Sequence, residues 1–187
     1  GCGTGRSYFN AVRGIMTSGK LSKADMTERL AGIKLLSIDT DGVLTDGGVY
    51  FNDAGEQMRR FNVKDGMGIK LAQGSDVQIA IISASSTPSI RHRAAALGVD
   101  HVLLAVEDKG QMLVELCEKL ELSLDQIAHV GDDVNDVPVM AMIGCPITVA
   151  DAVEEAKTAA LFVTEKKGGE GAVREVCDMI VVAKHPG

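Results

Sequence analysis

Short apolar segments and longer amphipathic segments alternate from residue 33 to near the end of the chain. The short apolar runs predict buried strands at 33–39, 77–83, 101–105, 127–132, 146–150 and 161–165. The amphipathic segments predict helices at 65–74, 87–98, 109–120, 135–144, 152–160 and 171–183. This alternation predicts an α/β fold with a doubly wound, mainly parallel sheet and helices on both faces.

Two further segments interrupt or precede this pattern. Residues 47–63 hold two β-rich arms around the turn Asn52-Asp53-Ala54-Gly55, which predicts a β-hairpin directly after the first strand. Residues 1–32 are Gly-rich and polar at first, and then offer one short helix at 22–32. We therefore expect an N-terminal extension over 1–32 and a single domain over 33–187.

Composition narrows the class of protein. The 187 residues are 45% hydrophobic but only 3% aromatic, so the core must be built mainly from aliphatic side chains, as in sheets covered on both faces. No apolar run approaches the roughly 20 residues of a membrane span, and the N-terminal stretch lacks the apolar centre of a signal peptide. A formal charge of −7 argues against a nucleic-acid partner.

The cysteines and histidines give no metal-ligand spacing. Three of the four cysteines, Cys117, Cys145 and Cys177, lie inside apolar segments, which predicts free buried thiols and fits a reducing cytoplasm. The four histidines, His129 among them, are interpreted as structural or surface residues.

Polar residues gather where the predicted strands end. The first strand ends in Asp39-Thr40-Asp41-Gly42, another ends in Ser83, and a third in Gly131-Asp132-Asp133. An aspartate at a strand end is commonly only a cap or turn residue. Several at the carboxyl edge of one parallel sheet converge on the crevice where such sheets bind ligands. Their hard oxygen ligands would suit Mg²⁺.

Lys109 opens a predicted helix, although a cation at that end opposes the helix dipole. Alone it would be interpreted as an exposed lysine. Beside the same crevice it could hold a phosphate and screen a nucleophilic carboxylate, while Ser83 could donate a hydrogen bond to a phosphoryl oxygen.

The order of these residues resembles the four motifs of the haloacid dehalogenase (HAD) phosphohydrolases. The chain is most similar to the cap-less (C0) 3-deoxy-D-manno-octulosonate 8-phosphate phosphatase family, in register from about residue 33 to 183. The segments that carry this resemblance are DTDGVLTDGGVYF, FNVKDGMGIKL, EDKG, GDDVNDVPVM and GGEGAVREVCDMI. The resemblance implies a Rossmann-like HAD fold without a cap domain and a Mg²⁺-dependent phosphomonoesterase of lipopolysaccharide biosynthesis.

The resemblance also implies roles for individual residues. Asp39 would attack phosphorus to form an aspartyl-phosphate, and Asp41 would act as general acid and then as general base. Mg²⁺ would be held by the side chains of Asp39 and Asp132 and the backbone carbonyl of Asp41. Phosphate would be bound by Ser83 and Lys109, and the metal ligands would be supported by Asp133 and Asp136.

Substrate recognition is implied for the segment after the hairpin and for one helix residue. The matching positions are Asn62, Lys64, Asp65, Gly66, Lys70 and Arg93. Arg59 and Arg60 are further cations that would attract an anionic sugar phosphate to this acidic chain. Each cation taken singly could equally be a solvated surface residue.

The chain departs from the family pattern after Ser83. Octulosonate enzymes usually carry Gly-Arg there and nononate relatives carry Gly-Glu, whereas this chain has Ala84-Ser85. Ser85, at the position expected to contact the sugar, is a small hydroxyl that cannot bind a carboxylate bidentately. A nononate (sialic-acid-like) 9-phosphate or another sugar phosphate is therefore an alternative substrate.

The absence of a cap segment leads us to expect assembly, because a neighbouring subunit would then exclude water from the site. The family expectation is a cytoplasmic homotetramer with active sites at subunit interfaces, built through the hairpin. Relatives of this domain also serve as oligomerisation modules, so a weakly active assembly module is the alternative from another class.

Overall fold

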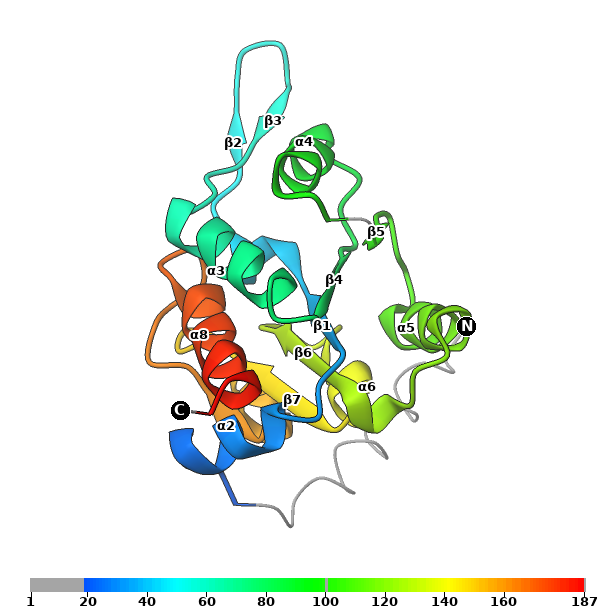
Figure 1. Cartoon of the computed structure of the whole chain (residues 1–187). Helices are drawn as coiled ribbons and strands as arrows, with labels where there is room; N and C mark the ends of the chain where they lie inside the picture. The colour runs from blue at the N-terminus through cyan, green and yellow to red at the C-terminus, as the bar shows by residue number, and fades with distance from the viewer. Residues whose placement is uncertain (1–18, 100, 187) are drawn as a thin grey trace.

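The computed structural model describes residues 19–99 and 101–186, and Figure 1 shows a sheet between two layers of helices. The strands are β1 (Leu35–Ile38), β2 (Tyr50–Phe51), β3 (Gln57–Met58), β4 (Gln78–Ile82), β5 (His101–Leu103), β6 (Ile127–Gly131), β7 (Cys145–Thr148) and β8 (Phe162–Val163). The helices are α2 (Lys23–Leu30), α3 (Val63–Gln73), α4 (Pro88–Leu97), α5 (Lys109–Leu120), α6 (Val137–Met140), α7 (Glu154–Ala159) and α8 (Ala172–Lys184), with short turns η1 (Thr40–Leu44) and η2 (Leu124–Gln126).

The main sheet has the strand order β5-β4-β1-β6-β7-β8, and every neighbouring pair is parallel. The chain runs from β1 outward to β4 and β5, and then returns to β6 on the other side of β1. The loops that follow β1 and β6 therefore diverge, which opens a crevice at the carboxyl edge of the sheet. The predicted α/β doubly wound fold is confirmed.

Side-chain alternation along the strands builds a core on each face of the sheet. All four residues of β1 are buried. Leu36 and Ile38 pack in the larger cluster with side chains from α2, α3, α4 and α8, whereas Leu35 points to the opposite cluster with side chains from α5. Because both faces are covered, the polar ends of the strands are left at the carboxyl edge.

The predicted hairpin is present between η1 and α3, where β2 and β3 pair antiparallel. Its turn is closed by the Gly55 N–H, which donates to the Asn52 carbonyl at 2.9 Å, while Asn52 Oδ1 accepts from the Ala54 and Glu56 N–H groups. In Figure 1 this hairpin projects away from the helices and the main sheet, next to α4.

Helix α2 belongs to the packed core although it precedes the predicted domain. Ser22 caps it by accepting from the Asp25 N–H, and Met26 and Leu30 are fully buried against the cluster that contains α8. Residues 1–18 of the predicted extension, with Cys2, lie outside the described residues. Cys117, Cys145 and Cys177 are buried and free, as predicted. Within residues 19–99 and 101–186, none of the helices combines the length and apolarity that a membrane crossing requires.

Candidate active site

The turn η1 begins directly after Asp39 and contains Asp41, the second aspartate after β1. Asp39 is extended (φ −72°, ψ 164°), and the chain leaves helical geometry at Asp41 and Gly42. Thr45 closes the turn, because its N–H donates to the Thr40 carbonyl and its Oγ1 accepts from the Gly42 N–H. Gly42 has φ +85°, a conformation that side chains rarely adopt. The Asp-x-Asp-Gly sequence thus produces a sharp turn that buries Asp39 and leaves Asp41 partly exposed.

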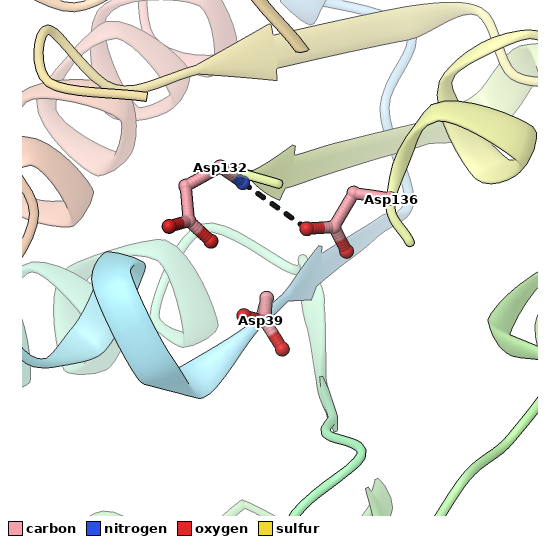
Figure 2. Close-up of side chains that lie close together, drawn as sticks. All are labelled: Asp39, Asp132 and Asp136. Carbon is pink, nitrogen blue, oxygen red and sulfur yellow. Dashed lines mark hydrogen bonds between the residues drawn. The ribbon is translucent and has the colours of Figure 1, made fainter. Parts of the chain in front are cut away.

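Three carboxylates converge beyond the ends of β1 and β6 (Figure 2). Asp39, Asp132 and Asp136 each place an oxygen within 4.8 Å of the other two. Asp136 is the residue directly before α6, and its Oδ2 accepts from the Asp132 backbone N–H at 3.1 Å. We expected Asp39, Asp41 and Asp132 to converge. The structure brings Asp39 and Asp132 together with Asp136, whereas the Asp41 carboxylate is bound by Arg59.

This convergence raises the pKa values of two of the carboxyls. Burial, followed by the charge of Asp136, raises the pKa of Asp39 to about 7, although Lys109 opposes the shift. Burial and the charges of Asp39 and Asp136 raise the pKa of Asp132 to about 8. A neighbouring divalent cation would restore both groups to their ionised form.

The donor set fits Mg²⁺. Oδ1 of Asp132 is buried and has no hydrogen-bond partner among residues 19–99 and 101–186, which is costly unless something else contacts it. Asp136 differs, because its oxygens already accept from Lys109, from His129 and from two backbone N–H groups. Asp39 and Asp132 therefore have oxygens available to bind a metal, whereas Asp136 holds Lys109 and the loop of Asp132 in place.

Lys109 lies between two of these carboxylates. Its Nζ donates to Asp39 Oδ1 at 2.8 Å and to Asp136 Oδ1 at 2.6 Å, and its side chain is only 2% exposed. Burial alone would lower the pKa of Lys109, but the two carboxylates outweigh it and raise that pKa above its ordinary value. These ion pairs compensate for the unfavourable position of Lys109 at the N-terminal end of the α5 dipole. Asp108 caps α5 by accepting from the Gln111 N–H.

A buried chain of hydrogen bonds continues behind Lys109. Asp136 contacts His129 Nε2 at 3.1 Å, and His129 Nδ1 contacts Ser37 Oγ at 3.0 Å. Although burial would raise the pKa of Asp136, His129 and Lys109 hold it well below the ordinary range. His129 is fully buried, so its structural interpretation holds. Its contact with Asp136, the partner of Lys109, could not be predicted from the spacing of these residues in the sequence.

Ser83 follows β4, the strand on the other side of β1 from β6. It is buried, and its Oγ accepts from the Ser85 N–H at 3.2 Å. The Asp133 carboxylate is turned back to its own loop, where Oδ1 accepts from the Val134 N–H. The sheet therefore brings Ser83, Asp39 and Asp132 to adjacent strand ends, as the sequence pattern predicts.

The candidate substrate residues divide into three places. Asn62 caps α3 and is joined to Arg93, whose Nη2 donates to the Asn62 carbonyl, while a side chain on Gly66 would collide with the same guanidinium. Asp65 is buried beneath α8, where its Oδ1 accepts from the Arg174 N–H. Lys64 and Lys70 are exposed on α3. These two lysines are thus not packed into the Asn62–Arg93 cluster.

The two hairpin arginines are both ion-paired. Arg59 binds Asp41 through two hydrogen bonds, and Arg60 Nη1 binds Asp46 at 3.0 Å. The sequence suggested only a general attraction of anions by these arginines. The specific partners, eighteen and fourteen residues away along the chain, could not be identified from their spacing.

Carboxylates after β1 and β6, a hydroxyl after β4 and a lysine at the start of α5 define a phosphohydrolase site of the haloacid dehalogenase class. The family model described as haloacid dehalogenase-like hydrolase matches residues 105–176, which include Lys109 and Asp132.

Curated and structural relatives narrow the class. The 3-deoxy-D-manno-octulosonate 8-phosphate phosphatase KdsC of Yersinia pestis is 42% identical over 160 residues, 86% of each chain. The Moraxella catarrhalis phosphatase, solved with a magnesium ion, a phosphate ion and KDO, matches with a TM-score of 0.83 and 35% identity over 85% of this chain and 91% of that one. The cobalt-bound Haemophilus influenzae enzyme matches with a TM-score of 0.80 and 38% identity over 83% and 91%. The chain belongs to the 3-deoxy-D-manno-octulosonate 8-phosphate phosphatase family, as its motifs predicted.

Proposed function

We propose that the protein is a Mg²⁺-dependent phosphomonoesterase that hydrolyses 3-deoxy-D-manno-octulosonate 8-phosphate. The observation that carries the proposal is the convergence of Asp39 and Asp132, with the buried Lys109 bonded to Asp39, in a chain 42% identical to a KdsC enzyme. Octulosonate is favoured over a nononate because the Yersinia relative is named for the octulosonate ester.

Asp39 is the proposed nucleophile. Its carboxylate lies at the end of a rigid buried strand and contacts Lys109, which lowers the repulsion that an incoming phosphate dianion would meet. Attack of an Asp39 oxygen on phosphorus forms an aspartyl-phosphate and releases the sugar alcohol. Water then hydrolyses the aspartyl-phosphate. Lys109 and the Ser83 hydroxyl would bind the phosphoryl oxygens during both steps.

Asp41 is the proposed acid–base group, because it follows Asp39 on the same turn and its side chain is 37% exposed. It would protonate the sugar oxygen as that oxygen leaves, and would then accept a proton from the attacking water.

Asp39, Asp132 and the backbone carbonyl of Asp41 would hold the magnesium ion. When bound, Mg²⁺ neutralises charge on the phosphoryl oxygens and keeps the clustered carboxylates ionised. Asp136 and Asp133 would support the loop that carries Asp132, since both lie in it and the Asp133 N–H donates to Asp136.

Substrate contacts are proposed for Asn62, Lys64, Asp65, Gly66, Lys70, Ser85 and Arg93. Among these residues, Asn62, Gly66 and Arg93 form one contact cluster at the start of α3. Lys64 and Lys70 have exposed ammonium groups that could reach a ligand bound by a neighbouring subunit.

We also propose a cytoplasmic homotetramer with active sites at the subunit interfaces. Large apolar side chains are exposed on the hairpin and on one face of α3: Val49, Tyr50, Phe51, Met58, Val63, Met67 and Leu71. The last three recur every fourth residue, so they form a stripe. Exposed apolar side chains gathered in a stripe are typical of association sites. Val63→Lys and Phe51→Lys should weaken the assembly and so lower the molar mass of the protein measured by light scattering. Val182→Lys on α8 should leave that molar mass unchanged.

Phosphate release from a panel of esters tests the proposed activity. The panel contains octulosonate 8-phosphate, a nononate 9-phosphate and neutral sugar phosphates, each with and without Mg²⁺. Wild type should release phosphate from octulosonate 8-phosphate fastest and only with metal, and Asp39→Asn should release none. A folded wild-type oligomer without activity on any ester would instead favour the assembly-module function.

A further inference from the structure

Arg59 holds the carboxylate of Asp41 in a bidentate fork. Its Nε donates to Asp41 Oδ1 at 2.6 Å and its Nη2 donates to Asp41 Oδ2 at 3.1 Å. The Arg59 side chain is only 4% exposed, although it comes from the outgoing arm of the hairpin. This is the geometry with which guanidinium groups recognise carboxylates in general.

The other N–H groups of Arg59 are bound by the loop after β4. Nη1 donates to Thr87 Oγ1 at 2.6 Å and to Gln57 Oε1 at 3.3 Å, and Nη2 donates to Ser85 Oγ at 3.0 Å. The hydroxyls of Ser85 and Thr87 also contact each other at 2.8 Å. These partners hold the guanidinium in one orientation, so it would keep its place if Asp41 turned away.

A cavity of about 660 Å³ adjoins these partners, and it is lined by Gln57, Ser85, Thr87 and their neighbours in residues 56–58 and 84–89. Its volume lies within the range of small-molecule sites. A ligand that entered it would meet the hydroxyls of Ser85 and Thr87, which bind Arg59. The carboxylate already paired with Arg59, that of Asp41, belongs to the proposed acid–base group.

We infer that Arg59 determines substrate specificity by exchanging carboxylates: it holds Asp41 until the carboxylate of an acidic sugar phosphate takes the place of Asp41. While Arg59 binds Asp41, both carboxylate oxygens of Asp41 are engaged by guanidinium N–H groups. An acidic sugar releases Asp41 by competing for the fork, whereas a neutral sugar phosphate leaves the pair intact. This inference rests on the proposed function, and it assigns the discrimination to a residue of the hairpin.

Binding of the free sugar acid tests the exchange without catalysis. The probe is 3-deoxy-D-manno-octulosonate without phosphate, titrated by calorimetry into wild type, Arg59→Gln and Asp41→Asn. Arg59→Gln should weaken binding about 10- to 100-fold, because a charge-assisted bidentate contact is lost. Asp41→Asn should tighten binding, because the competing carboxylate is gone. Unchanged or weaker binding by a folded Asp41→Asn variant would overturn the exchange.

Kinetics supply the second readout. Arg59→Gln should lower kcat/KM for octulosonate 8-phosphate about 10- to 100-fold relative to a neutral sugar phosphate. Arg60→Gln is the matched control, because Arg60 is the next residue but is 61% exposed and pairs with Asp46. Arg60→Gln should change kcat/KM for the acidic and the neutral sugar phosphate by the same factor. An equal loss on both substrates with Arg59→Gln would overturn the inference, whereas inactivity of wild type on every ester would overturn the proposed function instead.

Discussion

The carboxylate of Asp132 occupies the space that a side chain on Gly42 would need. A Cβ at Gly42 would overlap Asp132 Oδ2, and Gly42 also has φ +85°. The turn after β1 and the loop after β6 therefore approach each other as closely as they do only because residue 42 lacks a side chain.

Gly42→Ala should displace Asp132 and lower kcat/KM at least about 100-fold, since misplacement of an active-site group by about 1 Å has an effect of that size. Gly55→Ala is the matched control, because Gly55 also has positive φ (+78°) but a Cβ there would meet open space among the described residues. Both variants bear the backbone strain, so steady-state kinetics and Mg²⁺ titration isolate the contact with Asp132. Equal activity of the two variants would contradict this account.

The clustered carboxyls predict how stability depends on pH when the metal is removed. Folding raises the pKa of Asp39 to about 7 and that of Asp132 to about 8, so the folded state binds more protons than the unfolded state between about pH 4 and pH 8. The free energy of unfolding of the metal-free protein should therefore fall as pH rises through this window. Asp132→Asn should flatten the fall, as measured by urea unfolding at several pH values.

Magnesium should reverse that loss of stability. At a Mg²⁺ concentration about 100 times its Kd, binding contributes about 2.7 kcal/mol, or a rise in melting temperature of about 5–10 °C for a chain of this size. The rise should be larger at pH 8 than at pH 5.5, because protons compete for Asp39 and Asp132 at the lower pH. A pH-independent rise, or one that persists in Asp132→Asn, would place the metal elsewhere.

His129 should contribute to stability and to the position of Lys109 through Asp136. His129→Leu removes a partner from two buried groups, Asp136 and Ser37, so it should lower the free energy of unfolding by about 1–3 kcal/mol. His101→Leu is the control, because the hydrogen bond of His101 within the described part of the chain goes to an exposed partner, Gln78. This change should alter stability by less than about 0.5 kcal/mol. Chemical denaturation of both variants measures the difference, and equal losses would refute the role of His129.

The sequence pattern predicts the strands and their polar ends well because both depend on local periodicity. Apolar runs of the right length became β1, β4 and β6, and parallel pairing then brought Asp39, Ser83 and Asp132 to one edge without further information. The hairpin turn was predictable for the same reason, since the backbone contacts of Asn52 and Gly55 lie within four residues.

Contacts between distant segments could not be predicted in this way. The pairing of Arg59 with Asp41, the fit of Asp132 against Gly42 and the bond from His129 to Asp136 each depend on how loops meet in three dimensions. The burial of Met26 and Leu30 was also missed, because a short polar helix gives little sign of the surface it will cover.

Capture of the covalent intermediate tests the central claim most directly. Wild type with Mg²⁺ and octulosonate 8-phosphate is quenched in acid within the first turnover, and its peptides are examined by mass spectrometry. We predict one phosphoryl group on the peptide that contains Asp39, lost after hydroxylamine treatment and absent from Asp39→Asn. Rapid phosphate release with no phosphoryl group on the protein, or an active Asp39→Asn variant, would contradict the assignment of Asp39 as the nucleophile.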